Sequence, residues 1–429
     1  MNAAGQAVTK LTAAEFRAGL PAAELTVAGF RAGLRAWLAE HDLAPAPDRS
    51  LRGQVEQLAR VRRALYEAGW MRYGWPAEAG GLGGPAVLRA VLGEEIAARD
   101  LAEPGIWSLV EVLAPTMIAY ARPSLAAEMV PRLLSGREQW CQGFSEPGSG
   151  SDLASLTTRA VPLQGDGEAG GDWVVTGQKA WTSLAQYSAR CILLTRTAAG
   201  HGGITAFFAD MDAPGVTVRP LRTMHGVDEF AEVFFDDVVI PGDRMLGRPG
   251  DGWRLAADLL PHERSTCFWH RIAYLYARLD RLLAEMTAPA EAAAPAEAAA
   301  PAEAAAPDEA AALGAAYLAL HTARCRSRET QWRLAGGAGL GAETSVDKVL
   351  LATAEQVLFD TGRDLLPGVL ELTESPWRPE YLFSRAATIY GGTAEIQRNI
   401  IARRLLDLGR EWPWTPPNKT CSPRRCARR

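Results

Sequence analysis

The sequence has few cysteines and no long apolar run. Its six cysteines are scattered and form no CxxC pair, which argues against a zinc site or a disulfide framework and favours a reducing cytoplasm. No apolar run approaches the ~20 residues of a membrane span. The first ten residues lack the apolar core of a secretory signal. We therefore expect a cytoplasmic protein without a membrane span.

A strong excess of charge of either sign is also absent. Lys and Arg number 45 against 50 Asp and Glu, a formal net charge of −5, and no long basic stripe suggests a nucleic-acid partner. Hydrophobic residues make up 48% and charged residues 22% of the chain, typical of a globular protein with a full core. A length of 429 residues suggests roughly three domains, or two with extensions.

Hydrophobic periodicity changes twice along the chain. In the first third, Phe30, Leu34, Trp37 and Leu38 recur at helix spacing. The middle holds short runs rich in β-branched and aromatic residues, which predict a small β-barrel or sandwich. These runs are 173–175, 191–194, 206–208, 216–218 and 232–235. After Gly252 the helical period returns, with an apolar stripe at Phe268, Ile272, Leu275, Leu279 and Leu282.

These changes predict an α+β protein with a helical domain on each side of a β domain. The expected parts are an N-terminal extension (1–23), an N-terminal helical domain (24–137), a middle β domain (138–249), a C-terminal helical domain (250–410) and a disordered tail (411–429). A Pro-Ala-Glu-Ala-Ala-Ala repeat over 288–312 interrupts the C-terminal domain. Because a proline every six residues limits any helix to about one turn, we expect a solvated linker there.

Two polar runs could contact a ligand. Residues 140–152 read WCQGFSEPGSGSD, where small residues and hydroxyls could approach a phosphate or a flavin edge, although a polar interdomain loop has the same composition. Residues 176–183 read TGQKAWTS, in which a flat indole precedes two hydroxyls, and a core Trp at a hairpin end is the alternative.

These two runs and a third, IYGGTAEIQR at 389–398, resemble the signatures of the acyl-CoA dehydrogenase family. They occur in that family's order and separations, and the resemblance extends from about Phe30 to about Leu408. It implies an N-terminal helical domain, a middle β-barrel or sandwich domain and a C-terminal helical bundle, with FAD as cofactor. The residues implied to bind the cofactor are Gln142, Phe144, Ser145, Gly150, Ser151, Trp181, Thr182, Ser183, Thr393 and Glu395.

The residue after the signature tyrosine commonly provides the family's catalytic base as a Glu, and here it is Gly391. Some members carry the base at the start of the C-terminal domain, in a segment that ends in Glu-Arg. Residues 259–264, LLPHER, match that segment. The resemblance therefore implies Glu263 as the base and the Gly391 amide as a donor to the thioester carbonyl, with Arg264 and Ser151 contacting substrate.

Two local alternatives remain for Glu263. It could be an ordinary exposed Glu in the first turn of a helix, where the helix dipole favours it. Pro261 bears on the geometry: a helix beginning at Pro261 is favourable, whereas one beginning near Gly252 would be kinked there, which would shift Glu263.

The resemblance implies an FAD-dependent acyl-thioester (acyl-CoA) dehydrogenase that transfers hydride to flavin N5. Its acyl carrier would be CoA or an acyl carrier protein, and its electron acceptor an electron-transfer flavoprotein or another acceptor. Homodimers, homotetramers and heteromers with a homologue are all expected forms. The alternatives are a flavin-dependent oxidase or monooxygenase on the same fold, or a non-catalytic partner subunit. The last is favoured by the lack of the family's Arg and Phe-Gly segment near 276–283.

Overall fold

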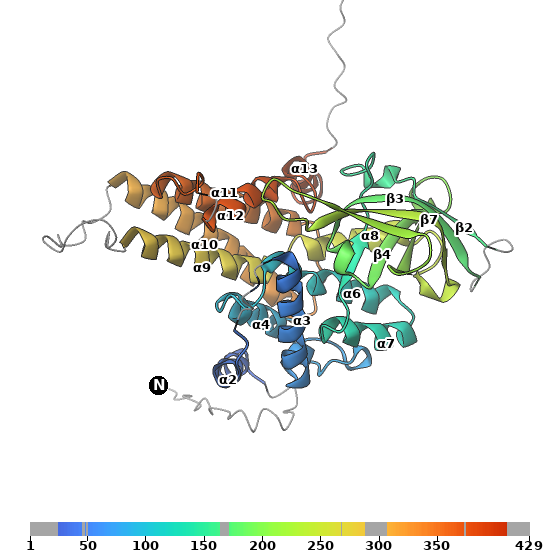
Figure 1. The fold of residues 1–429 in the computed structure, drawn as a ribbon, viewed down its shortest axis with the longest axis horizontal. Helices are drawn as coiled ribbons and strands as arrows, with labels where there is room; N and C mark the ends of the chain where they lie inside the picture. Colours follow the sequence, from blue (N-terminus) through green and yellow to red (C-terminus); the bar gives the residue numbers. More distant parts are fainter. Residues whose placement is uncertain are drawn as a thin grey trace, which may run out of the picture.

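The computed structural model consists of a helical part, a sheet and a second helical part in chain order, as the sequence predicts (Figure 1). It describes residues 25–44, 48, 50–163, 171–266, 268–287, 307–372 and 375–409. The N-terminal extension, the tail and residues 288–306 of the repeat lie outside the described residues.

The N-terminal helices begin at polar caps and bury the apolar stripe read from the sequence. Thr26 accepts a hydrogen bond from the Gly29 N–H at the start of α2, and Ser50 caps α3 in the same way. Phe30 and Leu34 are fully buried between these helices and their neighbours. The helices are α2 (Val27–Glu40), α3 (Leu51–Glu67), α4 (Val87–Ala97), α5 (Pro104–Ser108), α6 (Val110–Tyr120) and α7 (Pro123–Leu134).

The middle part is one eight-stranded sheet, and each of the five predicted strand segments lies in it. The order is β6-β7-β3-β2-β4-β5-β8, with β1 paired to β4 in parallel. The strands are β1 (Trp140–Gly143), β2 (Arg159–Pro162), β3 (Trp173–Ser183), β4 (Arg190–Arg196), β5 (Ile204–Asp210), β6 (Val216–Leu221), β7 (Phe230–Ile240) and β8 (Met245–Leu246). The first polar run therefore begins on β1, and the second lies within β3 of the same sheet.

The C-terminal helices include three long ones, α9, α10 and α11, which pack along one another (Figure 1). The predicted apolar stripe of α9 is buried throughout. The helices are α8 (Gly252–Glu263), α9 (Phe268–Thr287), α10 (Pro307–Ala335), α11 (Thr344–Leu365), α12 (Trp377–Ser384) and α13 (Ala394–Arg404).

One boundary of the repeat was wrong. Residues 307–312, predicted as linker, form the first turns of α10. Pro307 occupies the first helical position, where its missing N–H costs nothing. Asp308 and Glu309 follow in the first turn and favour the helix N-terminus.

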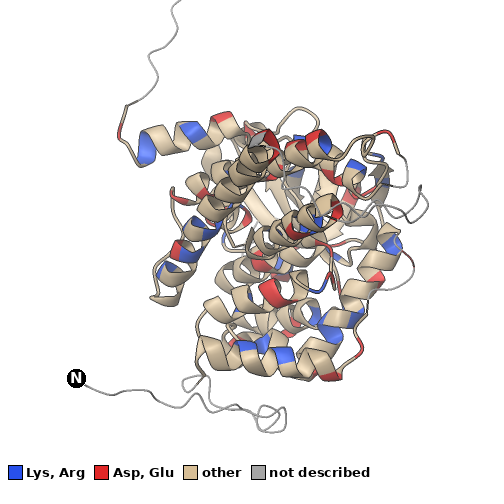
Figure 2. Cartoon of the chain, turned by 90° about the vertical axis from the view of Figure 1, so that its left-hand side faces the viewer, with Lys and Arg blue, Asp and Glu red and all other residues tan. Residues whose placement is uncertain are grey.

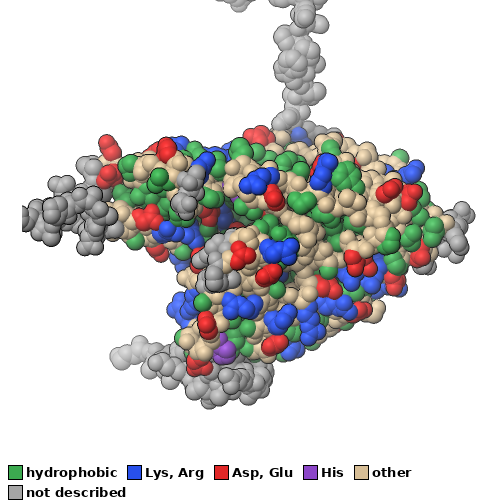
Figure 3. All heavy atoms as spheres, in the orientation of Figure 1, with side chains coloured by type: hydrophobic (Ala, Val, Ile, Leu, Met, Phe, Trp, Pro, Cys, Tyr) green, Lys and Arg blue, Asp and Glu red, His purple; other side chains and the backbone are tan. Residues whose placement is uncertain are grey.

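Charged side chains of both signs are interspersed along the helices and over the face seen in Figure 3 (Figures 2 and 3). Within the described ranges, no helix combines the length and apolarity needed to cross a bilayer.

Candidate active site

Glu263 lies in the last turn of α8, not in the first turn of a helix. α8 begins at Gly252, so Pro261 falls inside it and the alternative of a helix that begins at Pro261 is wrong. The helix ends directly after Glu263, and α9 begins at Phe268. A carboxylate at a helix C-terminus is disfavoured by the helix dipole. Helix stability therefore does not explain why a Glu stands here.

The half-buried Glu263 carboxylate meets two segments that are distant in sequence. The Gln142 side chain, on β1, donates from Nε2 to Glu263 Oε2 at 3.1 Å. On the other side, a Cβ built on Gly391 would lie 3.4 Å from Glu263 Oε1. Gly391 has φ +63°, a left-handed conformation that favours glycine. The structure thus brings together Gln142, Glu263 and Gly391.

The Gly391 peptide is held through its carbonyl. Arg264 Nε donates to Gly391 O at 3.1 Å, and Gln397 Nε2 donates to the same oxygen at 3.1 Å. In the part of the chain that the structure describes, the Gly391 N–H has no hydrogen-bond acceptor. Desolvation by burial lowers the pKa of Arg264, and the nearby Glu263 carboxylate opposes that shift. Arg264, predicted as a substrate contact, therefore contacts the glycine loop.

The other two motifs lie side by side. Ala180 N donates to Ser145 O at 2.9 Å, which sets the middle of the first run beside the Trp181-Thr182-Ser183 segment of β3. The β3–β7 register shifts between Lys179 and Thr182, and within that shift Trp181 adopts φ +58° with 62% of its surface exposed.

Thr182 beside it is 1% exposed, and its Oγ1 has no hydrogen-bond partner among the described residues. An exposed indole face next to an unpartnered buried hydroxyl suits a planar, polar-edged ligand, because the ring can stack while the edge accepts hydrogen bonds. A flavin fits this arrangement.

The remaining predicted cofactor residues are more dispersed. Phe144 is buried, whereas Gly150 and Ser151 are exposed and a Cβ at Gly150 would meet open space. Among the described contacts, none joins Ser151 to Glu263. Thr393 caps α13 by accepting from Ile396 N at 3.3 Å. The α13 N-terminus suits an anionic group such as a pyrophosphate, with the exposed Glu395 in its first turn.

A buried ion pair that the sequence did not reveal holds the first motif in place. Lys179 Nζ lies 2.8 Å from Glu146 Oε1, and the side chains are 0% and 5% exposed. Glu146 also accepts from the N–H groups of Thr157 and Thr158. Although burial acts against it, the Lys179 charge and these hydrogen bonds lower the pKa of Glu146 to about 2. The motif loop is therefore fastened to β3 close to Trp181. No pattern around Lys179 indicated that this lysine is buried.

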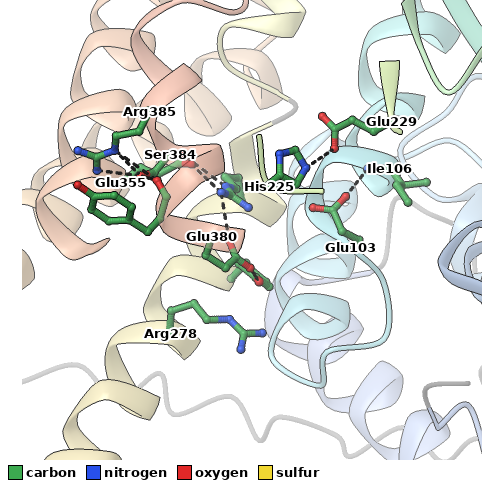
Figure 4. A network of polar contacts seen from close by, with 12 residues as sticks. Glu103, Ile106, His225, Glu229, Arg278, Glu355, Glu380, Ser384 and Arg385 are labelled. Carbon is green, nitrogen blue, oxygen red and sulfur yellow. Dashed lines mark hydrogen bonds and ion pairs between the residues drawn. The ribbon is translucent and has the colours of Figure 1, made fainter. Parts of the chain in front are cut away.

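A second polar cluster joins the three parts of the molecule (Figure 4). Arg271 on α9 lies 2.7 Å from Glu355 on α11 and 3.7 Å from Glu380 on α12. Glu103 caps α5, and His225 lies between β6 and β7. Burial raises the pKa of Glu380 to about 7, despite the opposing charge of Arg271.

The cluster reaches the glycine loop through aromatic rings. The Phe383 ring centroid lies 5.6 Å from that of His225 and 5.9 Å from that of Tyr390. Tyr390 directly precedes Gly391. Packing in this cluster therefore supports the loop that faces Glu263.

Family comparison identifies the class of protein to which this architecture belongs. Three models match in order: the acyl-CoA dehydrogenase N-terminal domain at residues 28–137, the middle domain at 141–238 and the C-terminal domain at 250–406. The chain belongs to the acyl-CoA dehydrogenase family. The family and fold class predicted from the signatures are confirmed, and members of this family are flavoproteins.

Individual relatives agree. Acyl-CoA dehydrogenase IpdE1 of Mycobacterium tuberculosis is 38% identical over 400 residues, covering 88% of this chain and 96% of the relative. Among solved structures, the Tcur3481-Tcur3483 steroid ACAD is 26% identical with a TM-score of 0.74, covering 90% of this chain and 98% of that one. The ChsE4-ChsE5 complex from M. tuberculosis is 27% identical with a TM-score of 0.73 and the same coverage.

Proposed function

We propose that this protein is an FAD-dependent acyl-thioester dehydrogenase that forms a double bond between the α and β carbons of an acyl-CoA. The observation that carries the proposal is the meeting of a carboxylate, Glu263, with the left-handed Gly391, whose amide has no acceptor among the described residues. A carboxylate and an N–H donor side by side are what proton abstraction next to a carbonyl requires.

In this proposal Glu263 takes the α-proton. The Gly391 N–H donates to the thioester carbonyl oxygen and stabilises the negative charge that develops there, an effect worth about 3 kcal/mol per donor in other enzymes. Gln142 orients the carboxylate through its hydrogen bond to Oε2. Arg264 fixes the glycine peptide from its carbonyl side, which leaves the N–H for the substrate.

Bound FAD would accept the β-hydrogen together with its electron pair. The flat face of Trp181 would pack on the flavin ring, and Thr182 and Ser183 would supply hydroxyls to its edge. Ser145 would donate from the adjacent loop, and the N-terminus of α13 at Thr393 would receive the pyrophosphate. An electron-transfer flavoprotein or a similar carrier would then reoxidise the protein.

The test is anaerobic flavin bleaching. The purified protein, with its FAD content measured, is mixed with butyryl-, isovaleryl-, octanoyl- and palmitoyl-CoA and with the CoA thioester of a steroid carboxylic acid, included because a solved relative is titled a steroid ACAD. We expect at least one thioester to bleach the 450-nm band and to yield a 2-enoyl-CoA. A flavin-loaded protein that no thioester bleaches would contradict the proposal, and rapid peroxide formation on admitting air would favour an oxidase.

We also infer that the working form contains more than one chain. Two solved relatives carry titles that join two chains, Tcur3481-Tcur3483 and ChsE4-ChsE5. A homologous partner, or a second copy of this chain, would then cover the flavin packed on Trp181. Light scattering on the purified protein gives its oligomeric state. If the protein is a flavin-free monomer, adding a homologue should restore both flavin binding and activity. A flavin-loaded, active monomer would contradict the inference.

A further inference from the structure

A buried lysine stands beside the proposed base. Lys348, on α11, is 2% exposed. Its Nζ donates to Ala387 O at 2.6 Å and lies 3.7 Å from the centroid of the Tyr390 ring. Carbonyl and ring contacts do not neutralise an ammonium group, and a buried charge is costly unless an opposite charge is near. The position of Lys348 therefore calls for a carboxylate.

The adjacent acid does not meet that need. Asp347 points to a different set of partners: it accepts from Ser265 Oγ at 2.7 Å, Arg326 Nε at 2.8 Å and Thr330 Oγ1 at 2.8 Å. Its carboxylate is thus saturated with donors and has its own cation in Arg326.

Glu263 and Lys348 converge on the space that the glycine leaves open. A Cβ built on Gly391 would lie 3.4 Å from Glu263 Oε1, 3.4 Å from Lys348 Cε and 4.0 Å from Lys348 Nζ. The two side chains reach this point from different helices, α8 and α11. A Cβ at position 391 would already touch both side chains, so any side chain longer than a methyl group would compete with them for this space.

We propose that Lys348 is a positioning residue for the base: its ammonium group holds the Glu263 carboxylate directed at the space in front of Gly391. This inference rests on the proposed function of Glu263. Gln142 orients one carboxylate oxygen, Oε2, and Lys348 faces the side of the other, Oε1. The carboxylate is then fixed from β1 and from α11 before substrate arrives.

The other charged groups near Glu263 have different engagements. Arg264, at the end of α8, donates to Gly391 O, and Arg404 on α13 lies close enough to lower the pKa of Arg264. Burial lowers the pKa of His262 to about 4, so this neighbour is neutral at pH 7. Tyr390 presents its ring to Lys348. Among the described cations, Lys348 thus reaches the Oε1 side of Glu263 from a second helix, α11.

The first test compares kcat and KM at pH 7, measured with the thioester of the panel above that bleaches the wild-type flavin fastest. In Lys348→Met we expect kcat to fall about tenfold with KM little changed, because the carboxylate is no longer held in place and misplacement of a reacting group costs rate. Lys348→Arg, which keeps the charge, should recover most of the lost kcat. An unchanged kcat in a Lys348→Met protein with full flavin content would overturn the inference.

The second test does not depend on turnover. Urea unfolding is measured for the wild type, Lys348→Met, Glu263→Gln and the double variant. We expect the double variant to lose less stability than the two single losses combined, since each single change leaves the other group buried without its partner. Lys179→Met with Glu263→Gln is the matched control, because Lys179 pairs with Glu146 instead, and it should be additive.

An additive Lys348–Glu263 cycle would overturn the inference even if Glu263→Gln is inactive. A Glu263→Gln protein with normal turnover would overturn the proposed function itself. If Lys348→Met does not fold, Lys348→Gln carries the same two tests, because it removes the charge and keeps a donor for Ala387 O.

Discussion

At the scale of single residues, Gly391 combines a left-handed backbone with an open space beside the proposed base. Its φ of +63° is in the left-handed region, and the space beside its Cα holds atoms of Glu263 and Lys348. The position after the signature tyrosine thus carries no side chain, and a carboxylate from α8 lies beside it. The conformation disfavours any residue with a Cβ, and a side chain longer than a methyl group would meet Glu263 and Lys348.

Gly391→Ala should therefore lower both stability and activity. We expect a loss of about 1–2 kcal/mol from the left-handed backbone alone, plus a further loss of kcat because the methyl group meets Glu263. Gly368→Ala is the control, with φ +76° and nothing within 4 Å of the added Cβ. Urea unfolding measures the stability of both variants, and steady-state turnover measures their kcat. Equal kcat in the two variants would show that the contact with Glu263 is unimportant.

Gln142→Leu should lower kcat more than it raises KM. The change removes the amide hydrogen bond to Glu263, and a hydrogen bond to a charged group is worth about 1.5–3 kcal/mol, or roughly 10–100-fold in rate. Gln356→Leu is the control. It also loses a hydrogen bond from a side-chain amide, here to the Ser384 carbonyl, at a position far from the base in sequence. If both variants keep wild-type kcat, Gln142 does not orient the base.

At the scale of elements, the Glu146–Lys179 pair fastens the 144–152 loop to β3 and thus sets the distance between the two cofactor motifs. The pKa of Glu146 is lowered to about 2. A group with a lowered pKa stabilises the fold above its unfolded pKa, near 4.5, and that stability is lost as pH falls from there towards 2.

We expect wild-type stability to fall between pH 5 and pH 3 more steeply than that of Glu146→Gln, which has no proton to gain. At pH 7 the variant should be less stable, because Lys179 is left without its carboxylate. Urea midpoints at pH 7, 5 and 4 measure both effects, with the exposed Glu78→Gln as control. Parallel pH curves for wild type and Glu146→Gln would contradict the account.

Period and composition were enough to predict the order of elements and the segments of several strands, since side-chain burial alternates locally. The helical start at Pro307 was not predicted, because a proline inside a repeat indicates a helix break, although proline also suits the first position of a helix. The motifs supplied Glu263 and Gly391. The burial of Lys179 and Lys348 could not be predicted, because a buried lysine is recognisable only once its partners are placed in space.

The same limit applies to the site contacts. Gln142 and Glu263 are 121 positions apart, and Arg264 and Gly391 are 127 apart. No local pattern encodes such a meeting. Only the packing of β1, α8 and the loop before α13 produces it.

At the scale of the whole molecule, the cluster around Glu380 joins the C-terminal helices to α5 and to the β6–β7 connection (Figure 4). Burial raises the pKa of Glu380 to about 7. A carboxyl group with a raised pKa supports the fold fully below its unfolded pKa, near 4.5, and this support is lost as pH rises through 7.

Between pH 5 and pH 8, Glu380→Gln should therefore lose less stability than the wild type. The amide keeps an acceptor for the Tyr274 hydroxyl, and Arg271 keeps Glu355. Urea unfolding at pH 5, 6.5 and 8 gives the comparison. A wild type whose stability falls no more than that of Glu380→Gln over this range would show that the carboxyl group does not titrate there.

The central claim is that Glu263 is the base that starts the reaction. Its most direct test is the rate of anaerobic flavin bleaching in Glu263→Gln, with the thioester that bleaches the wild type fastest and with flavin content matched. We predict a rate about 10²–10⁴-fold below wild type, the usual contribution of a positioned base, while Glu78→Gln bleaches normally. A Glu263→Gln protein that bleaches at the wild-type rate would contradict the claim.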